Sequence, residues 1–226
     1  MAHTAHFSCS FYDLLFITKV HQTDTTTVLC NLAKYNTQSL PSALRHIIEE
    51  AGLSLNLTDH LAQLVVETRH SKGSLLIRQG HRCNDIYIIE QGFARIYSIV
   101  CGRETTTLFA RENDIITSTF ALFTKLESRE FVEILEDSVL LKIDYEEFFE
   151  CCREHGQLMH LYRFLMEKYY MALEERTLSL QFDSALERYQ KLLNRHPFIL
   201  QRASLGSIAS YLGMSPVTLS RMRALV

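Results

Sequence analysis

Six side chains near the end of the chain combine two guanidinium groups, three hydroxyl groups and one β-branched apolar group within nine positions. Arginine donates two hydrogen bonds to a guanine edge, an apolar group contacts the methyl of thymine, and hydroxyl groups bind bases or phosphates. One short helix would present all six together. We therefore predict double-stranded DNA as the partner of Ser215, Val217, Thr218, Ser220, Arg221 and Arg223.

The preceding residues predict the two helices that would hold this set. A first helix would span Ser204–Leu212, and Gly213 would supply a sharp turn because glycine takes positive φ without a Cβ penalty. Ser215 is a typical N-cap, and Pro216 suits the first helical position. This is the helix-turn-helix pattern, although an ordinary helical hairpin packed on a core is the alternative. The inward face of the first helix would consist of Leu205, Ile208, Ala209 and Leu212.

Charge is unevenly distributed along the 226 residues. The formal net charge is −3, yet residues 183–226 hold six basic and two acidic side chains, a net +4 that leaves −7 on the rest. An acidic body with a basic terminal module is consistent with DNA binding by that module alone.

Composition excludes several other classes of protein. No apolar run reaches the roughly 18 residues of a membrane span, so we expect a cytoplasmic protein without a membrane partner. The six cysteines are scattered, which favours reduced thiols over a disulfide framework. No nucleophile elbow, phosphate-binding loop or dinucleotide fingerprint occurs, so we expect no enzyme and no catalytic residue.

The rest of the chain predicts three further segments. Residues 1–39 are rich in Thr, Ser and His and lack periodicity, which indicates a poorly ordered extension. Residues 40–145 begin with two helices, the second running from Thr58 through Thr68, and continue as many short strands. Such strands favour a small antiparallel barrel or jelly roll.

A long helix is predicted over residues 146–182, before the helix-turn-helix domain at 183–226. Its apolar seam is too long to be covered by a small barrel alone, which favours a dimer helix in a homodimer. The alternative is that the helix packs on its own barrel. The seam consists of Leu158, Leu161, Leu165, Tyr169 and Ala172.

Two stretches carry a family resemblance that covers residues 40–226. Leu75–Gly92 contains Gly80, Tyr87, Ile89 and Gly92 at the spacing of a β-roll signature, and Ile208–Arg221 reads I-A-x-x-L-G-x-S-x-x-T-L-S-R. In this order, joined by a long helix, they resemble the CRP/FNR family of bacterial transcription regulators. The resemblance implies an α+β fold with an antiparallel β-roll sensor domain, a dimerisation helix and a helix-turn-helix domain. It also implies a homodimer on a near-palindromic DNA site that recruits or blocks RNA polymerase under control of an effector in the roll.

The chain departs from the ligand-binding members of that family. Their Gly-Glu pair for a cyclic nucleotide is replaced by Thr117 and Ser118, and Arg129 at the arginine position is followed by Glu130. A carboxylate beside a phosphate repels it, so we expect no cyclic AMP, and Thr117, Ser118 and Arg129 stay candidates for another effector. Cys9 and Cys30 are too far apart to form the tight N-terminal cysteine group of an iron–sulfur cluster, and no metal site is predicted. Cys151 and Cys152 are either a redox switch or an inert pair, and we favour the inert pair.

The DNA-binding end also departs from the family pattern. Pro216 and Val217 cannot donate hydrogen bonds where the family often places polar base-reading residues, and no winged hairpin follows the second helix before Val226. The second interpretation is therefore a β-roll interaction protein whose degenerate helix-turn-helix docks a protein partner.

Overall fold

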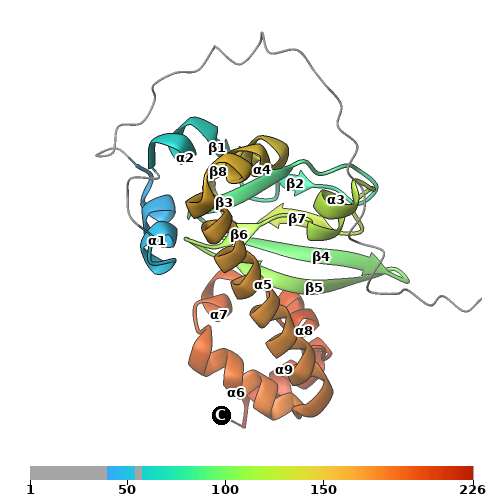
Figure 1. The fold of residues 1–226 in the computed structure, drawn as a ribbon. Helices are drawn as coiled ribbons and strands as arrows, with labels where there is room; N and C mark the ends of the chain where they lie inside the picture. Colours follow the sequence, from blue (N-terminus) through green and yellow to red (C-terminus); the bar gives the residue numbers. More distant parts are fainter. Residues whose placement is uncertain (1–39, 54–57, 226) are drawn as a thin grey trace, which may run out of the picture. The chain divides into compact units, whose positions relative to one another are not determined.

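The computed structural model describes residues 40–53 and 58–225 (Figure 1). The prediction that residues 1–39 are poorly ordered, and the assignments made for Cys9 and Cys30, lie outside this range. The described chain opens with helix α1 (Ser42–Glu50) and helix α2 (Thr58–Leu64). Leu44, Ile47 and Ile48 of α1 are buried, as their helical spacing predicts.

Two four-stranded antiparallel sheets form the β-roll. The first has the order β1-β8-β3-β6 and the second the order β2-β7-β4-β5. A short helix, α3 (Thr119–Thr124), follows β6. The strands are β1 (Val65–His70), β2 (Leu75–Ile77), β3 (Asp85–Gln91), β4 (Ala94–Val100), β5 (Arg103–Ala110), β6 (Ile115–Ile116), β7 (Phe131–Ile134) and β8 (Ser138–Asp144).

The predicted fold class is confirmed, with one correction at the start of the roll. The second helix was expected to continue through Thr68, but α2 ends at Leu64 and β1 begins at Val65. Val65 and Val66 are β-branched, and β1 pairs with β8 over its whole length, from Val65 opposite Ile143 to His70 opposite Ser138. Pairing with a strand 68 to 78 positions away therefore overrides a helical spacing that is local.

Side chains from both sheets close the interior of the roll. Ile89, Ile116 and Leu140 of the first sheet pack with Ile96 and Val132 of the second, and all five are almost fully buried. A second apolar cluster fixes α1 and the helices after the roll to the outer side of the first sheet.

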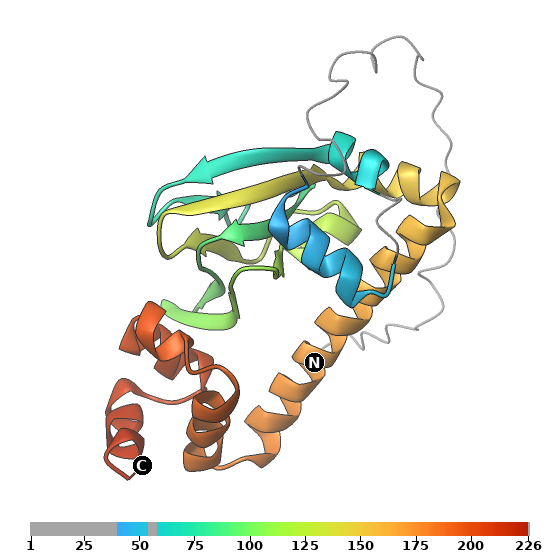
Figure 2. The ribbon, with the colours of Figure 1, turned by 90° about the vertical axis from the view of Figure 1, so that its left-hand side faces the viewer.

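The helix predicted over residues 146–182 is two helices, α4 (Tyr145–Glu154) and α5 (Gly156–Phe182). His155 between them has extended backbone angles, φ −124° and ψ 99°. Figure 2 shows α5 running from the roll to the C-terminal helices, and Lys168 of α5 forms an ion pair with Glu50 of α1. Within the described residues, no helix is long and apolar enough to cross a membrane.

The predicted dimer seam is wrong for the first part of α5. Leu158 and Leu161 are 0% and 2% exposed because they belong to the cluster that includes Leu44 and Phe148, and Leu165 packs against the same cluster. Here the alternative holds, and the helix packs on its own roll. Periodicity reveals that a stripe is apolar but does not identify what covers it.

The C-terminal helices are α6 (Ala185–Arg195), α7 (Ile199–Arg202), α8 (Leu205–Tyr211) and α9 (Pro216–Arg223). They share an apolar cluster with two aromatic residues of the roll, Phe93 and Phe109, whose rings stack 5.6 Å apart. The terminal domain is therefore packed against the roll as well as joined to α5.

Candidate nucleic-acid interface

The turn between α8 and α9 has the geometry that its sequence predicts. Gly213 has φ +64°, its N–H donates to Ser210 O at 3.1 Å, and the N–H of Met214 donates to Ala209 O at 3.0 Å. These two bonds are a Schellman motif, in which a left-handed residue ends a helix. A Cβ at Gly213 would also lie 2.7 Å from Leu180 Cδ2 of α5, so glycine fits both the conformation and the space.

The start of α9 is capped as predicted. Ser215 has extended backbone angles, and its Oγ accepts a hydrogen bond from the N–H of Thr218 at 3.1 Å. Pro216 occupies the first turn, where its missing N–H costs no helical bond. The hydroxyl groups of Ser215 and Thr218 lie 2.9 Å apart, so the cap already engages these two members of the predicted set.

One face of the helix pair is buried. Ile208, Ala209, Leu212 and Leu219 are at most 5% exposed and belong to the C-terminal core. Leu205 was expected on this face but is 51% exposed, because it is the first residue of α8 and lies outside the contact with the roll.

The opposite face of α9 is open. Ser215, Val217, Ser220, Arg221 and Arg223 are exposed and Thr218 is partly exposed, so the helix brings the six predicted residues together on one short element. Within the described part of the chain, neither Arg221 nor Arg223 takes part in an ion pair. Two cations without a carboxylate partner on an exposed helix suit an anionic ligand such as duplex DNA.

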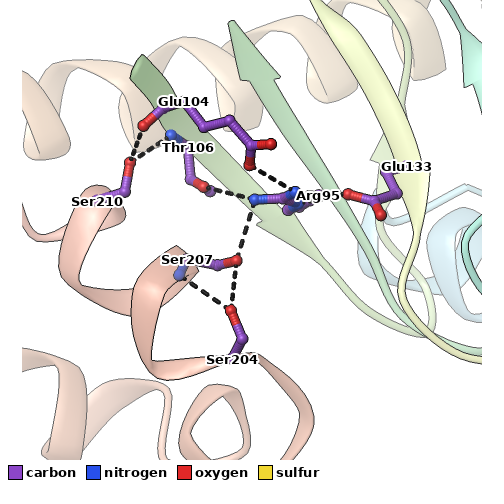
Figure 3. A network of polar contacts seen from close by, with 7 residues as sticks. All are labelled: Arg95, Glu104, Thr106, Glu133, Ser204, Ser207 and Ser210. Carbon is purple, nitrogen blue, oxygen red and sulfur yellow. Dashed lines mark hydrogen bonds and ion pairs between the residues drawn. The ribbon is translucent and has the colours of Figure 1, made fainter. Parts of the chain in front are cut away.

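The polar side of α8, by contrast, faces the roll and is bonded to it (Figure 3). Arg95 of β4 is 8% exposed, forms ion pairs with Glu133 at 2.7 Å and Glu104 at 2.9 Å, and donates to Ser207 Oγ of α8 at 3.0 Å. A buried guanidinium needs such carboxylate partners because desolvation penalises an unpaired charge.

Ser210 adds a main-chain contact to the same interface. Its Oγ accepts from the N–H of Thr106 and donates to Glu104 O, both at 2.9 Å, so it bonds to the backbone of the edge strand β5 (Figure 3). The two serines of α8 therefore fix the helix-turn-helix to the roll.

A second polar contact lies at α7. Arg202 forms ion pairs with Glu112 at 2.8 Å and with Glu136, and its guanidinium lies 4.7 Å from the centre of the Phe93 ring. The Arg202 hydrogen bonds hold the pKa of Glu112 well below its ordinary value, at about 2.

The sequence did not identify Arg95, Ser207, Ser210 or Arg202 as functional residues. The available signal was weak: an arginine inside an otherwise apolar strand, and serines three positions apart on a helix next to a turn. The contacts that join these C-terminal helices to the roll link residues 66 to 112 positions apart, which local pattern does not reveal.

The three candidate effector residues of the roll are not gathered around one cavity. Thr117 donates to Asp85 O at 2.9 Å, and Ser118, which is fully buried, accepts from Ser128 Oγ at 2.9 Å. Arg129 is exposed, with its guanidinium 3.9 Å from the centre of the Phe120 ring. Thr117 lines a cavity of about 30 Å³ with mostly apolar walls, and neither Ser118 nor Arg129 lines it.

The adjacent thiols of α4 have the environment of unreactive cysteines. Burial raises the pKa of Cys152 to about 11, and burial together with nearby carboxylates raises that of Cys151. Both effects disfavour the thiolate, which is the reactive form. In the described residues, no group of three or more His, Cys, Asp or Glu side chains has the arrangement of a metal site.

Comparison with known proteins confirms the resemblance in fold. Residues 67–155 match the cyclic nucleotide-binding domain family. FixK2 from Bradyrhizobium japonicum is 17% identical with a TM-score of 0.61, covering 71% of this chain and 83% of its own. The c-di-GMP-responsive regulator CLP from Xanthomonas campestris is 13% identical with a TM-score of 0.62, covering 76% and 91%.

A third solved structure is a protein from Eubacterium rectale described as a regulator of the crp/fnr family. It is 16% identical with a TM-score of 0.60, covering 79% of this chain and 85% of its own. A comparison with curated proteins gives no match. The chain therefore contains a cyclic nucleotide-binding-type β-roll within the overall fold of CRP/FNR regulators.

Proposed function

We propose that this protein is a bacterial transcription regulator that binds a near-palindromic DNA site as a homodimer in the cytoplasm. The observation that carries this proposal is the exposed face of α9, where Arg221 and Arg223 stand beside three hydroxyl groups and have no ion-pair partner among the described residues. The same domain holds the positive charge of an otherwise acidic chain. We propose no catalytic activity.

The side chains of α9 divide into two roles. Arg221 is one and a half turns into the helix and would read a guanine edge, while Val217 would contact a thymine methyl. Ser220 and Arg223 would hold phosphates, and Arg223 lies nearest the C-terminal end of α9. Ser215 acts chiefly through its cap, which keeps the N-terminus of α9 ordered.

A homodimer would explain a second apolar stripe on α5. It is shifted by one position from the buried seam, and its members recur every seven residues, the period at which two helices pack in a coiled coil. Three of the four are 36–37% exposed and the other is partly exposed. The stripe consists of Met159, Met166, Leu173 and Leu180, of which the last three also border other elements of their own chain.

We propose that cyclic AMP is not the effector. Ligand pockets usually measure about 300–1,000 Å³, whereas the cavity next to Thr117 measures about 30 Å³. Isothermal titration with cyclic AMP should show no binding, and micromolar affinity would contradict this part of the proposal.

Bound to DNA, the dimer would act by recruiting or blocking RNA polymerase.

One observation favours a second function, docking of a protein partner. Val217 is 62% exposed near the start of α9, where a hydrogen-bond donor would be expected in a base-reading helix. In that case Arg221 would have no specific role on DNA.

Selection of binding sites from a random duplex library, followed by Arg221→Ala, separates the two functions. The regulator should enrich a near-palindromic sequence, and the variant should lose about 1–3 kcal/mol of binding and relax specificity at one base pair in each half-site. Failure to enrich any sequence, with equal binding by the variant, would favour the protein partner.

A further inference from the structure

A cavity of about 400 Å³ lies where the second half of α5 meets the end of β5 and the C-terminal helices. Its volume is within the range of small-molecule sites. It is separate from the candidate effector residues of the roll, because none of Thr117, Ser118 and Arg129 lines it.

The cavity has an apolar interior. Leu108 of β5, Leu165 and Ala172 of α5, Leu192 of α6 and Ile199 of α7 line it, so four separate elements contribute apolar surface. Such walls would bury the body of a drug-sized organic molecule rather than a simple hydrated ion.

Its polar lining is strongly cationic. Six basic side chains line the cavity against two carboxylates, Asp114 and Glu175. Three of the six have carboxylate partners: Lys168 pairs with Glu50, Lys191 with Asp183 and Arg195 with Glu175. The other three, Arg111, Arg176 and Arg188, form no ion pair with any described residue.

Arg176 of α5 is the most informative of these three cations. One of its terminal nitrogens donates to Thr106 O at 2.8 Å and to Tyr211 O at 3.1 Å, which leaves the positive charge without a counter-charge. Its Nε is buried and is the one such side-chain atom in the described residues that lacks a hydrogen-bond partner. Burying an unsatisfied charged donor is costly, and an anion in the cavity would satisfy it.

We propose that this cavity binds an organic anion, with an acidic head group at Arg176 and an apolar body against α5 and α6. A neutral ligand would leave Arg176 unsatisfied, and a cation would be repelled by the excess of basic side chains. A carboxylate bonds to a guanidinium through two parallel hydrogen bonds when both nitrogens are free, and through one charge-assisted bond at Nε otherwise.

The position of the cavity links its occupant to the arrangement of the terminal domain. Leu165, Ala172 and Leu108 lie on α5 and the roll, whereas Tyr211 and Leu212 lie at the end of α8. A ligand that contacts both sides binds the docked arrangement more tightly and so stabilises it. Any effect of this stabilisation on DNA affinity rests on the proposed function. The binding of the organic anion to the cavity does not rest on it.

Titration calorimetry of the full chain tests the site with matched probes. Octanoate and indole-3-acetate supply an acidic head group, and octanamide and indole-3-acetamide are their neutral counterparts. Each carboxylate should bind at least about tenfold more tightly than its amide, because only the carboxylate compensates a buried guanidinium.

Two variants locate the binding. Ala172→Phe should fill the cavity and abolish binding, whereas Met171→Phe, one position earlier and 60% exposed outside the cavity, should leave it unchanged. Arg176→Met should reduce carboxylate binding to the level of the amide, and Arg176→Lys should restore part of the difference. If Arg176→Met does not fold, the comparison of Ala172→Phe with Met171→Phe still tests whether the probes bind in this cavity.

Three results would overturn the proposal: no probe binds at millimolar concentration, carboxylates and amides bind alike, or Ala172→Phe binds as well as Met171→Phe. Absence of DNA binding would instead count against the proposed function and leave the calorimetric result standing.

Discussion

Helices α8 and α9 form one motif, yet their polar faces meet different surroundings. Ser207 and Ser210 of α8 are engaged by Arg95, Thr106 and Glu104 of the roll. Arg221 and Arg223 of α9 are exposed and have no ion-pair partner in the described chain. The difference indicates separate roles for the two helices. Helix α8 fixes the terminal domain to the rest of the protein, and α9 is available to contact another molecule.

The largest expected effect is a loss of unfolding free energy on substitution of Arg95, which contacts α8. Arg95→Met removes the ion-pair partner of Glu133 and one hydrogen-bond donor to Ser207, and breaking such a buried ion pair should cost about 3 kcal/mol of unfolding free energy. Urea unfolding followed by circular dichroism measures it, since the chain lacks tryptophan. Arg103→Met, on the exposed start of β5, is the control, and an equal loss in both variants would show that α8 does not depend on Arg95.

A substitution on α9 should lower DNA affinity and leave the unfolding free energy nearly unchanged. Arg221→Ala should change the unfolding free energy by less than about 0.5 kcal/mol, because the side chain is exposed and has no ion-pair partner in the described chain. Its DNA affinity should fall by about 1–3 kcal/mol in a titration with labelled duplex. A variant that loses stability but keeps its DNA affinity would remove the distinction between the two helices.

Two glycine-to-alanine substitutions, one in the turn that joins the helices and one inside α8, should cause smaller changes in stability of opposite sign. Gly213→Ala should cost about 1–2 kcal/mol, because φ +64° is unfavourable for alanine and the new Cβ would meet Leu180. Gly206→Ala, inside α8 with no atom nearer than 3.9 Å to the new Cβ, should stabilise by up to about 1 kcal/mol. Urea midpoints moving in the same direction for both variants would contradict the assigned turn conformation.

The smallest effect concerns pH, because Glu112 is partly exposed and solvent screens its ion pair. The pKa of Glu112 is about 2 in the folded protein and 4.5 ordinarily, so its ion pair with Arg202 stabilises the fold above pH 4.5. This contribution is lost as the pH falls from 4.5 toward 2. Glu112→Gln should therefore be less stable than the wild type at pH 7, with a difference that shrinks below pH 4.5. A difference independent of pH between 7 and 3 would contradict this assignment.

Much of the fold and the central motif could be predicted from sequence because their signals are local. Gly213 and Ser215 mark the turn and the cap within three positions, and alternating apolar residues between Gly80 and Gly102 mark β3 and β4. The β1 strand escaped prediction because its partner β8 is far along the chain.

The buried contacts could not be predicted for a related reason. On α5 two apolar stripes differ by one position, and sequence alone does not show that Leu158 packs inward while Met159 stays 36% exposed. Arg95 likewise gives no sign in sequence that its carboxylate partners come from two other strands. The cavity at Arg176 arises from elements that meet only in the folded chain.

The most direct test of the account is a salt series of binding to random duplex DNA, comparing the full chain with Arg221→Ala/Arg223→Ala. The wild type should bind at low salt and weaken linearly on a logarithmic plot, whereas the double variant should bind at least about tenfold more weakly with a slope shallower by about 1. Equal affinity and slope for the two proteins, or no binding by the wild type at low salt, would contradict DNA binding through α9.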